Sequence, residues 1–127
     1  MNTATEHKIK VEVESTYLAE QSDPNQERFV FAYNITIRNQ GSIPAKLLNR
    51  HWVITDANGK IEEVRGEGVV GDQPHLQPGE QYEYSSGAIL KTPVGAMEGD
   101  YEWVDDLGKH FIAPIPVFSL QTPNTVN

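Results

Sequence analysis

The chain has 127 residues, which is enough for one domain with a hydrophobic core and too few for two. Its 18 Asp and Glu outnumber its 10 Lys and Arg, and the net charge of −8 disfavours nucleic acid and anionic membranes as partners while suiting a basic one. The absence of cysteine excludes disulfides and thiolate chemistry.

Alternating apolar residues predict the first strands. Residues 9–14 alternate apolar and charged side chains, as a half-buried strand does, and the polar residues 20–26 read as a loop. Residues 28–39 form the strongest strand, because five apolar side chains alternate along it and share one face, whereas a helix would distribute them around its circumference. These side chains are Phe29, Phe31, Tyr33, Ile35 and Ile37.

The next segments predict a hairpin. Residues 45–55 make the third strand, and residues 56–59 close a turn in which Asn58-Gly59 supplies the positive φ angles that tight hairpins require. Residues 60–64 then return antiparallel to the third strand.

Two more strands are expected near the C-terminus. A turn at residues 93–95 precedes a strand over residues 96–104, in which Met97, Tyr101 and Trp103 pack inward. Tyr101 near its start suits a tyrosine corner, whose hydroxyl bonds back to nearby backbone.

The last strand is expected over residues 110–120. Its Pro114 and Pro116 cannot donate to a β-ladder, so we predict an edge strand or a bulged one.

Together with the aromatic alternation at Tyr82 and Tyr84, these segments give about seven strands, with turns every ~8–12 residues and no convincing helix, which indicates an all-β fold. We expect a two-sheet β-sandwich of the immunoglobulin or fibronectin type III kind and prefer it to a closed barrel. The chain is expected to be one domain over residues 1–127, with an ordered core over roughly residues 7–120.

Residues 66–71, Gly-Glu-Gly-Val-Val-Gly, match the motif G-x-G-x-x-G letter for letter. This motif binds a pyrophosphate when a strand precedes it and a helix follows it. Pro74 and Pro78 prevent a helix from continuing beyond its first turn. The side chains around the motif are acidic, and Arg65 is the single basic one among them. We therefore predict that residues 66–79 form a stiff crossing between two sheets, in which the glycines serve the backbone. Phosphate binding stays open as the alternative.

No catalytic or metal-binding constellation is predicted. No serine lies in a nucleophile elbow, and the acidic pairs at residues 62–63 and 105–106 are interpreted as solvated strand rims and turns. No two histidines have the H-x-H or H-x-x-x-H spacing of metal ligands, so no specific metal site is predicted. The histidines are His7, His51, His75 and His110.

Arg50, His51 and Trp52 form a further candidate. Strand alternation places Arg50 and Trp52 on one face and His51 on the other. One interpretation is a core tryptophan with an arginine stacked or paired beside it. The other is a recognition patch, because tryptophan and arginine are frequent interface anchors.

Many spaced residues resemble the ApaG family. The glycine motif carries the similarity, and residues 50–52 before it and 111–120 after it extend the match. The resemblance is taken to cover nearly the whole chain. Between the motif and the last strand it rests on Gln73-Pro74, Leu76, Pro78-Gly79-Glu80, Tyr82, Tyr84-Ser85-Ser86-Gly87, Leu90, Thr92-Pro93, Gly95, Met97, Gly99 and Tyr101.

The resemblance implies a fibronectin type III-like sandwich of the stand-alone bacterial form. It also implies a gene that in many bacteria neighbours the gene of a diadenosine tetraphosphate hydrolase. A second family name, CorD, links the family to cobalt and magnesium efflux. Related eukaryotic domains, in F-box proteins and in a DNA polymerase-interacting protein, look like interaction modules. The family has no established catalytic residues, so none is carried over.

The chain start lacks the apolar region of a signal peptide, and no run approaches the ~18 apolar residues of a membrane helix. We therefore expect a cytoplasmic, non-enzymatic module that binds an unidentified protein partner without a cofactor, as a monomer or a weak dimer. The expected surface is the crossing over residues 66–78 together with the neighbouring strand edges, and the interaction candidates are Arg50, Trp52, Glu67 and Asp72.

Two alternatives remain. One is binding of a nucleotide or dinucleoside polyphosphate at Gly66, Gly68 and Gly71. The other is divalent-metal binding linked to cobalt and magnesium efflux.

Overall fold

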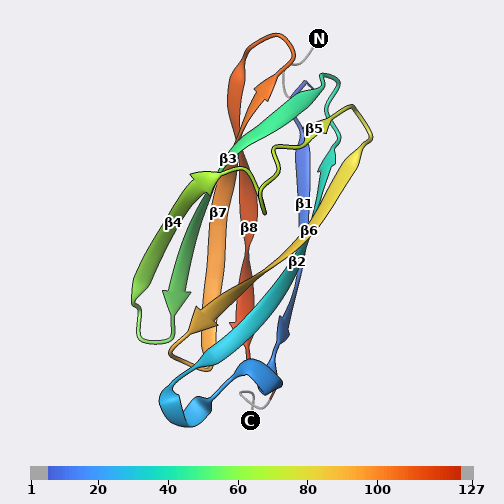
Figure 1. Cartoon of the computed structure of the whole chain (residues 1–127). Coiled ribbons are helices and arrows are strands. Elements are labelled where there is room, and N and C mark those ends of the chain that lie inside the picture. The colour runs from blue at the N-terminus through green and yellow to red at the C-terminus, as the bar shows by residue number, and fades with distance from the viewer. Residues whose placement is uncertain (1–5, 124–127) are drawn as a thin grey trace.

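The computed structural model describes residues 6–123, which form a sandwich of two antiparallel β-sheets (Figure 1). The three-stranded sheet, in the order β1-β2-β6, consists of β1 (Ile9–Tyr17), β2 (Phe29–Asn39) and β6 (Gln81–Leu90). The other sheet has the order β4-β3-β7-β8, with β5 also beside β3. Its strands are β3 (Ala45–Asp56), β4 (Ile61–Glu67), β5 (His75–Leu76), β7 (Val94–Asp105) and β8 (His110–Gln121). The predicted all-β sandwich is confirmed. The ordered core expected over roughly residues 7–120 excludes both ends of the chain, and of these ends residues 1–5 and 124–127 lie outside the described residues.

β2 is the central strand of the smaller sheet and pairs along its length with β1 and β6. Its predicted inward face is confirmed, because Phe31, Tyr33, Ile35 and Ile37 are each at most 6% exposed. The period of two in the sequence therefore translates directly into one buried face. The segment expected as a loop before β2 holds two short 3-10 turns, η2 (Ala19–Gln21) and η3 (Pro24–Gln26).

Aromatic rings join the two sheets across the core. The ring of Trp52, on β3, meets those of Tyr33, Tyr101 and Phe118 edge to face, at centroid distances of 5.5, 6.5 and 5.9 Å. Such pairs contribute about 0.5–1.5 kcal/mol each beyond their burial. Trp52 is 3% exposed, so its interpretation as a core tryptophan is confirmed.

The predicted tyrosine corner is wrong. Tyr101 lies well inside β7, and its hydroxyl oxygen is 2.5 Å from that of Tyr84 on β6 instead of bonding to backbone. Burial raises the pKa of both hydroxyls, so both stay protonated and each can serve as the partner of the other inside the core.

Several element boundaries differ from the prediction, and β1, expected over residues 9–14, extends to Tyr17. β4 continues to Glu67, so Gly66 belongs to a strand and the crossing begins later than expected. The turn expected at residues 93–95 lies at residues 91–93, because β7 already begins at Val94. β5 was not predicted, since a two-residue strand shows no alternation to detect.

The two sides of the sandwich differ. β1 packs along β8 on one side, whereas β4 and β6 make no comparable contact on the other, which leaves that side open. β8 is an edge strand, as its prolines predict, and it is also bulged. Between Met97 and Gly99 the register with β7 shifts, so that Pro116 and Val117 stand opposite a single residue.

Candidate functional site

The crossing between the sheets, residues 68–80, lies on the open side of the sandwich (Figure 1). As predicted, it contains no helix. Its first part is a tight turn over residues 69–72, closed by hydrogen bonds from the Val69 amide to the Asp72 carbonyl at 2.8 Å and in the reverse direction at 2.9 Å. Both central residues have positive φ, +48° at Val70 and +84° at Gly71, as in a type I′ turn.

Val70 is the unusual residue of this 69–72 turn. A β-branched side chain in the left-handed region clashes with its own backbone, and such strain costs on the order of 1–3 kcal/mol. The Val70 side chain is 61% exposed, so burial does little to offset that strain, whereas its neighbour Val69 is fully buried. The turn therefore places one apolar residue in the core and displays the next one to solvent.

Several contacts hold the turn in place. The Gly68 amide donates to the Leu48 carbonyl at 2.8 Å, and the Arg50 guanidinium donates to the carbonyls of Glu67 and Gly68 at 3.1 and 3.0 Å. These bonds fix the start of the turn to β3. The start of the turn thus has little freedom to relax.

A further hydrogen bond fixes the end of the 69–72 turn to the other sheet. The Tyr82 hydroxyl, on β6, donates to Asp72 Oδ2 at 2.6 Å. This bond to a carboxylate raises the pKa of the Tyr82 hydroxyl. The turn is therefore tied to both sheets, which explains how its strain can persist.

The glycines serve the backbone, as predicted. A Cβ at Gly66 would lie 2.6 Å from Arg50 Cζ, so the missing side chain makes room for the guanidinium. A Cβ at Gly68 would lie 2.4 Å from the Asp72 carbonyl oxygen, and Gly68 also has a φ of +64°. A phosphate would further compete with the internal acceptors of the Gly68 and Val69 amides, next to the exposed carboxylates of Glu67 and Asp72.

The structure brings together three of the four interaction candidates. Arg50, Glu67 and Asp72 all lie at or beside the 69–72 turn, whereas Trp52 is buried in the core. Val70 does not stand out in the sequence, because a valine in a loop carries no local sign of its φ. The available signal is the run Val69-Val70-Gly71, followed by Pro74. Two consecutive apolar residues in a tight turn cannot both point into the core, so one of them must be exposed.

Each histidine pairs with a carboxylate. His7, His51 and His75 approach Asp105, Glu63 and Asp106 at 2.7, 2.8 and 2.7 Å, and His110 approaches Glu102 at 3.2 Å. Within residues 6–123, no three His, Asp or Glu side chains gather in a way that could hold a metal ion.

The acidic pair at residues 105–106 is only partly solvated. Asp105 is 4% exposed, which corrects the interpretation of that carboxylate as a solvated turn residue. Its carboxylate accepts a hydrogen bond from His7 and two from the amides of Leu107 and Lys109. These bonds hold the pKa of Asp105 below its usual range, with the His7 bond as the largest cause.

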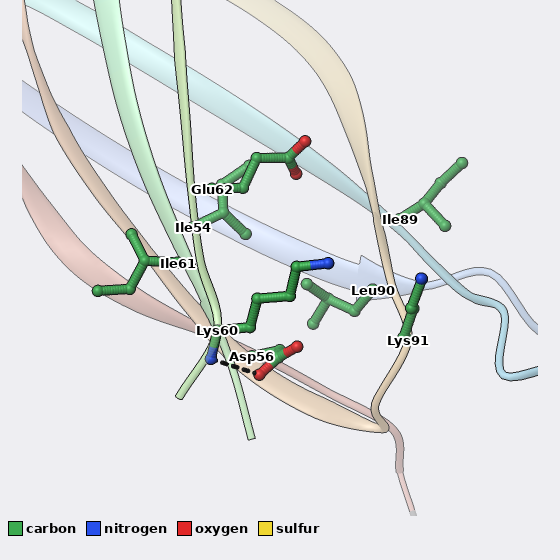
Figure 2. A pocket seen from close by; sticks show the side chains of 8 residues that line it. All are labelled: Ile54, Asp56, Lys60, Ile61, Glu62, Ile89, Leu90 and Lys91. Atoms are coloured by element: carbon green, nitrogen blue, oxygen red, sulfur yellow. Dashed lines mark hydrogen bonds between the residues drawn. The ribbon is translucent and has the colours of Figure 1, made fainter. Parts of the chain in front are cut away.

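A groove lies between the start of β4 and the end of β6, on the same open side (Figure 2). Its outer part has a volume of about 350 Å³ and is lined by the end of β3, the start of β4 and the end of β6. An inner part of about 550 Å³ shares Ile54, Glu62 and Ile89 with it and reaches Arg50 and Trp52. We refer to both parts together as the β4–β6 groove.

The comparisons with known proteins agree with this architecture. The profile of the ApaG domain matches residues 19–105. The chain belongs to the ApaG family. The ApaG protein of Acidithiobacillus ferrooxidans is 57% identical over 112 residues, 88% of each chain, and that of Thiobacillus denitrificans is 53% identical over 127 residues, all of both chains.

A solved structure shares the fold over almost its whole length. The crystal structure of an ApaA protein from Bordetella pertussis matches with a TM-score of 0.90 at 50% identity, covering 94% of this chain and 97% of that one. The resemblance to the ApaG family that the spaced residues indicated is thus confirmed. Over residues 6–123, none of the helices has the length and apolar character needed to cross a membrane.

Proposed function

We propose that this ApaG-family protein is a non-enzymatic module that binds a protein partner, and that the 69–72 turn is the centre of its contact surface. The observation that carries the proposal is Val70, an exposed apolar side chain held in a strained backbone conformation. Strain that the surrounding structure maintains is found most often at functional positions.

The choice of residue supports a binding role. A type I′ turn is served at no steric cost by glycine or asparagine at its first central position. Valine there lowers stability and, at 61% exposure, fills little of the core in return. Its benefit would come from a partner that buries it, because a rigid, pre-organised apolar side chain loses little entropy on binding.

The surroundings of the turn indicate the character of the partner. Glu67 and Asp72 are exposed beside Val70, so an apolar pocket with a basic rim would complement this surface. Two of the three ionisable groups beside the turn already have partners, Asp72 with Tyr82 and Arg50 with two carbonyls, and the third, Glu67, is exposed. Groups engaged in this way are poorly placed for general acid–base catalysis.

In this proposal, the partner protein, and not this chain, accounts for the links of the family to diadenosine tetraphosphate and to cobalt and magnesium. They do not require a nucleotide or a metal ion bound by this chain.

A pair of matched variants tests the proposal. Val70→Asn removes the apolar side chain and introduces a residue that tolerates positive φ. The control, Val117→Asn, changes a valine of nearly equal exposure, 63% against 61% at Val70, on the bulged edge of β8. Partners would be captured from an extract of the encoding bacterium on each immobilised variant and quantified by mass spectrometry. We expect Val70→Asn to lose a specific partner that both the wild type and Val117→Asn retain. Identical partner sets for all three proteins, or no specific partner for the wild type, would contradict the proposal.

A further inference from the structure

The floor of the β4–β6 groove is apolar. Leu90 of β6 is buried and extends toward β4, and Ile54 of β3 lines the same space (Figure 2). Ile61 on β4 and Ile89 on β6 are 62% and 53% exposed, and Figure 2 shows both side chains directed away from the space between the two strands. An aliphatic side chain that entered the groove would therefore pack on Ile54 and Leu90.

The charge of the groove is opposite to that of the protein. Four cationic side chains line its two parts, against the two anionic side chains of Asp56 and Glu62, in a chain whose net charge is −8. The cationic residues are Arg28, Arg50, Lys60 and Lys91.

Two of these cations are available to a ligand. Figure 2 shows the Lys60 side chain extending from the residue just before β4 toward Leu90 of β6, with Lys91 at the opposite rim. Within residues 6–123, neither Lys60 nor Lys91 forms an ion pair. The carboxylate of Asp56, by contrast, already accepts hydrogen bonds from the amides of Asn58 and Lys60.

One wall of the groove is an unpaired strand edge. β4 is the terminal strand of the larger sheet, so the backbone groups on its outer edge have no strand partner. Unlike β8, the edge strand at the other end of that sheet, β4 contains no proline and has no register shift in its pairing. An exposed edge of this kind accepts an added extended segment through main-chain hydrogen bonds.

We infer that the β4–β6 groove is a binding site for an extended acidic segment of another protein. The segment lies along β4, packs an aliphatic side chain on Ile54 and Leu90, and directs a carboxylate to Lys60 and Lys91. The inner part of the groove shares Arg50 with the 69–72 turn, where the guanidinium donates to the carbonyls of Glu67 and Gly68. The contacts proposed for the segment, at Lys60, Lys91 and the start of β4, do not involve the turn, so the site does not depend on the function proposed for that turn.

A peptide titration tests the inference directly. The probe is a short fluorescein-labelled peptide of alternating leucine and glutamate, compared with the same peptide carrying lysine in place of glutamate. Binding is followed by fluorescence anisotropy and by backbone amide shifts of the isotopically labelled protein. We expect the acidic peptide alone to bind, with amide shifts concentrated in β4 and at Ile89, Leu90 and Lys91. No binding of the acidic peptide at millimolar protein concentration would overturn the inference.

Charge-reversal variants separate a specific site from general attraction. Lys60→Glu with Lys91→Glu should weaken binding of the acidic peptide about tenfold, because two favourable charge contacts become repulsive. The control is Lys10→Glu with Lys109→Glu, which changes the net charge equally at exposed positions outside the groove. Equal weakening by both double variants would overturn the inference.

Two further measurements distinguish other occupants and the other proposal. If β4 amide signals change with protein concentration alone and sedimentation shows a dimer, a second copy of the chain occupies the edge and the inference is wrong. Val70→Asn should bind the peptide like the wild type, and Lys60→Glu with Lys91→Glu should retain any partner that is captured through Val70. Loss of peptide binding in Val70→Asn would contradict the independence of the two sites.

Discussion

The turns of this protein follow two different designs. Residues 56–60 and 105–109 both have the sequence Asp-x-x-Gly-Lys and the same contacts. In each, the aspartate carboxylate accepts two backbone amides, at 2.8 and 2.9 Å from Asp56 and at 2.9 Å twice from Asp105. The positive φ falls on a glycine, +82° at Gly59 and +85° at Gly108.

The 69–72 turn uses the opposite design. Its positive φ angles fall on Val70 as well as on Gly71, and its stability comes from contacts outside the turn, to β3 and to β6. The Asp-x-x-Gly-Lys turns are locally consistent, whereas the 69–72 turn is imposed by its surroundings. Local consistency is the rule in natural sequences, and departures from it concentrate at functional sites.

The largest expected effect comes from glycine replacement in the two kinds of turn. Gly68→Ala should lower the free energy of unfolding by about 3 kcal/mol or more, because it combines positive φ with a collision against the Asp72 carbonyl. Gly59→Ala should cost only about 1 kcal/mol, since open space surrounds its Cβ. Urea unfolding of both variants measures the difference. Equal losses would show that the 69–72 turn is no more constrained than the hairpin turn.

Relief of strain gives the next effect, in the opposite direction. Val70→Gly should raise the free energy of unfolding by about 1 kcal/mol, because the strain removed exceeds the added flexibility of the unfolded chain. Val117→Gly, at similar exposure but in a strand, should lower it. A lower thermal midpoint for Val70→Gly would mean that Val70 is not strained.

The tie between the turn and β6 contributes a smaller amount. Tyr82→Phe removes the exposed hydrogen bond to Asp72 and should cost about 0.5 kcal/mol. Because the folded pKa of Tyr82 is raised, this contribution is complete below the tyrosine pKa of the unfolded chain and is lost as pH rises through the folded value. Tyr84 and Tyr101 ionise above the usual range in both proteins, so ultraviolet absorbance titration should show that the tyrosine missing from Tyr82→Phe is a further one that ionises above the usual range. If the missing tyrosine instead ionises in the usual range, the predicted bond is contradicted.

The smallest effect is confined to acid pH and concerns the 105–109 turn. The folded pKa of Asp105 is lowered, so its contribution is present above the aspartate pKa of the unfolded chain and is lost as pH falls through the folded value. Unfolding free energies measured from neutral to acid pH should therefore fall less in Asp105→Asn than in the wild type. Parallel pH profiles would show that the carboxylate of Asp105 is not held by His7 and the turn amides.

The sequence was sufficient wherever local pattern and tertiary structure agree. The alternation in β2, the hairpin at residues 56–59 and the edge position of the proline-containing β8 all followed from rules that act within a few residues. The hairpin differs in one detail, because only Gly59 and not Asn58 takes a positive φ. The absence of a helix after the glycine motif followed equally from its prolines.

The rest depended on contacts between distant residues. Tyr101 meets Tyr84 across the core, Asp105 is buried by His7 from the far end of the chain, and Val70 is strained because β3 and β6 hold its turn. The β4–β6 groove likewise combines segments that are separated by about thirty residues. No periodicity or local motif encodes such pairings.

The most direct test of a contact role for Val70 is site-specific photo-crosslinking in the living bacterium. A photo-reactive amino acid would replace Val70 in one strain and Val117 in another, two positions of nearly equal exposure. The proposed function predicts that a defined protein is crosslinked from position 70 and is absent from the products at position 117. The same products from both positions, or none from position 70 while the protein is expressed and folded, would contradict it.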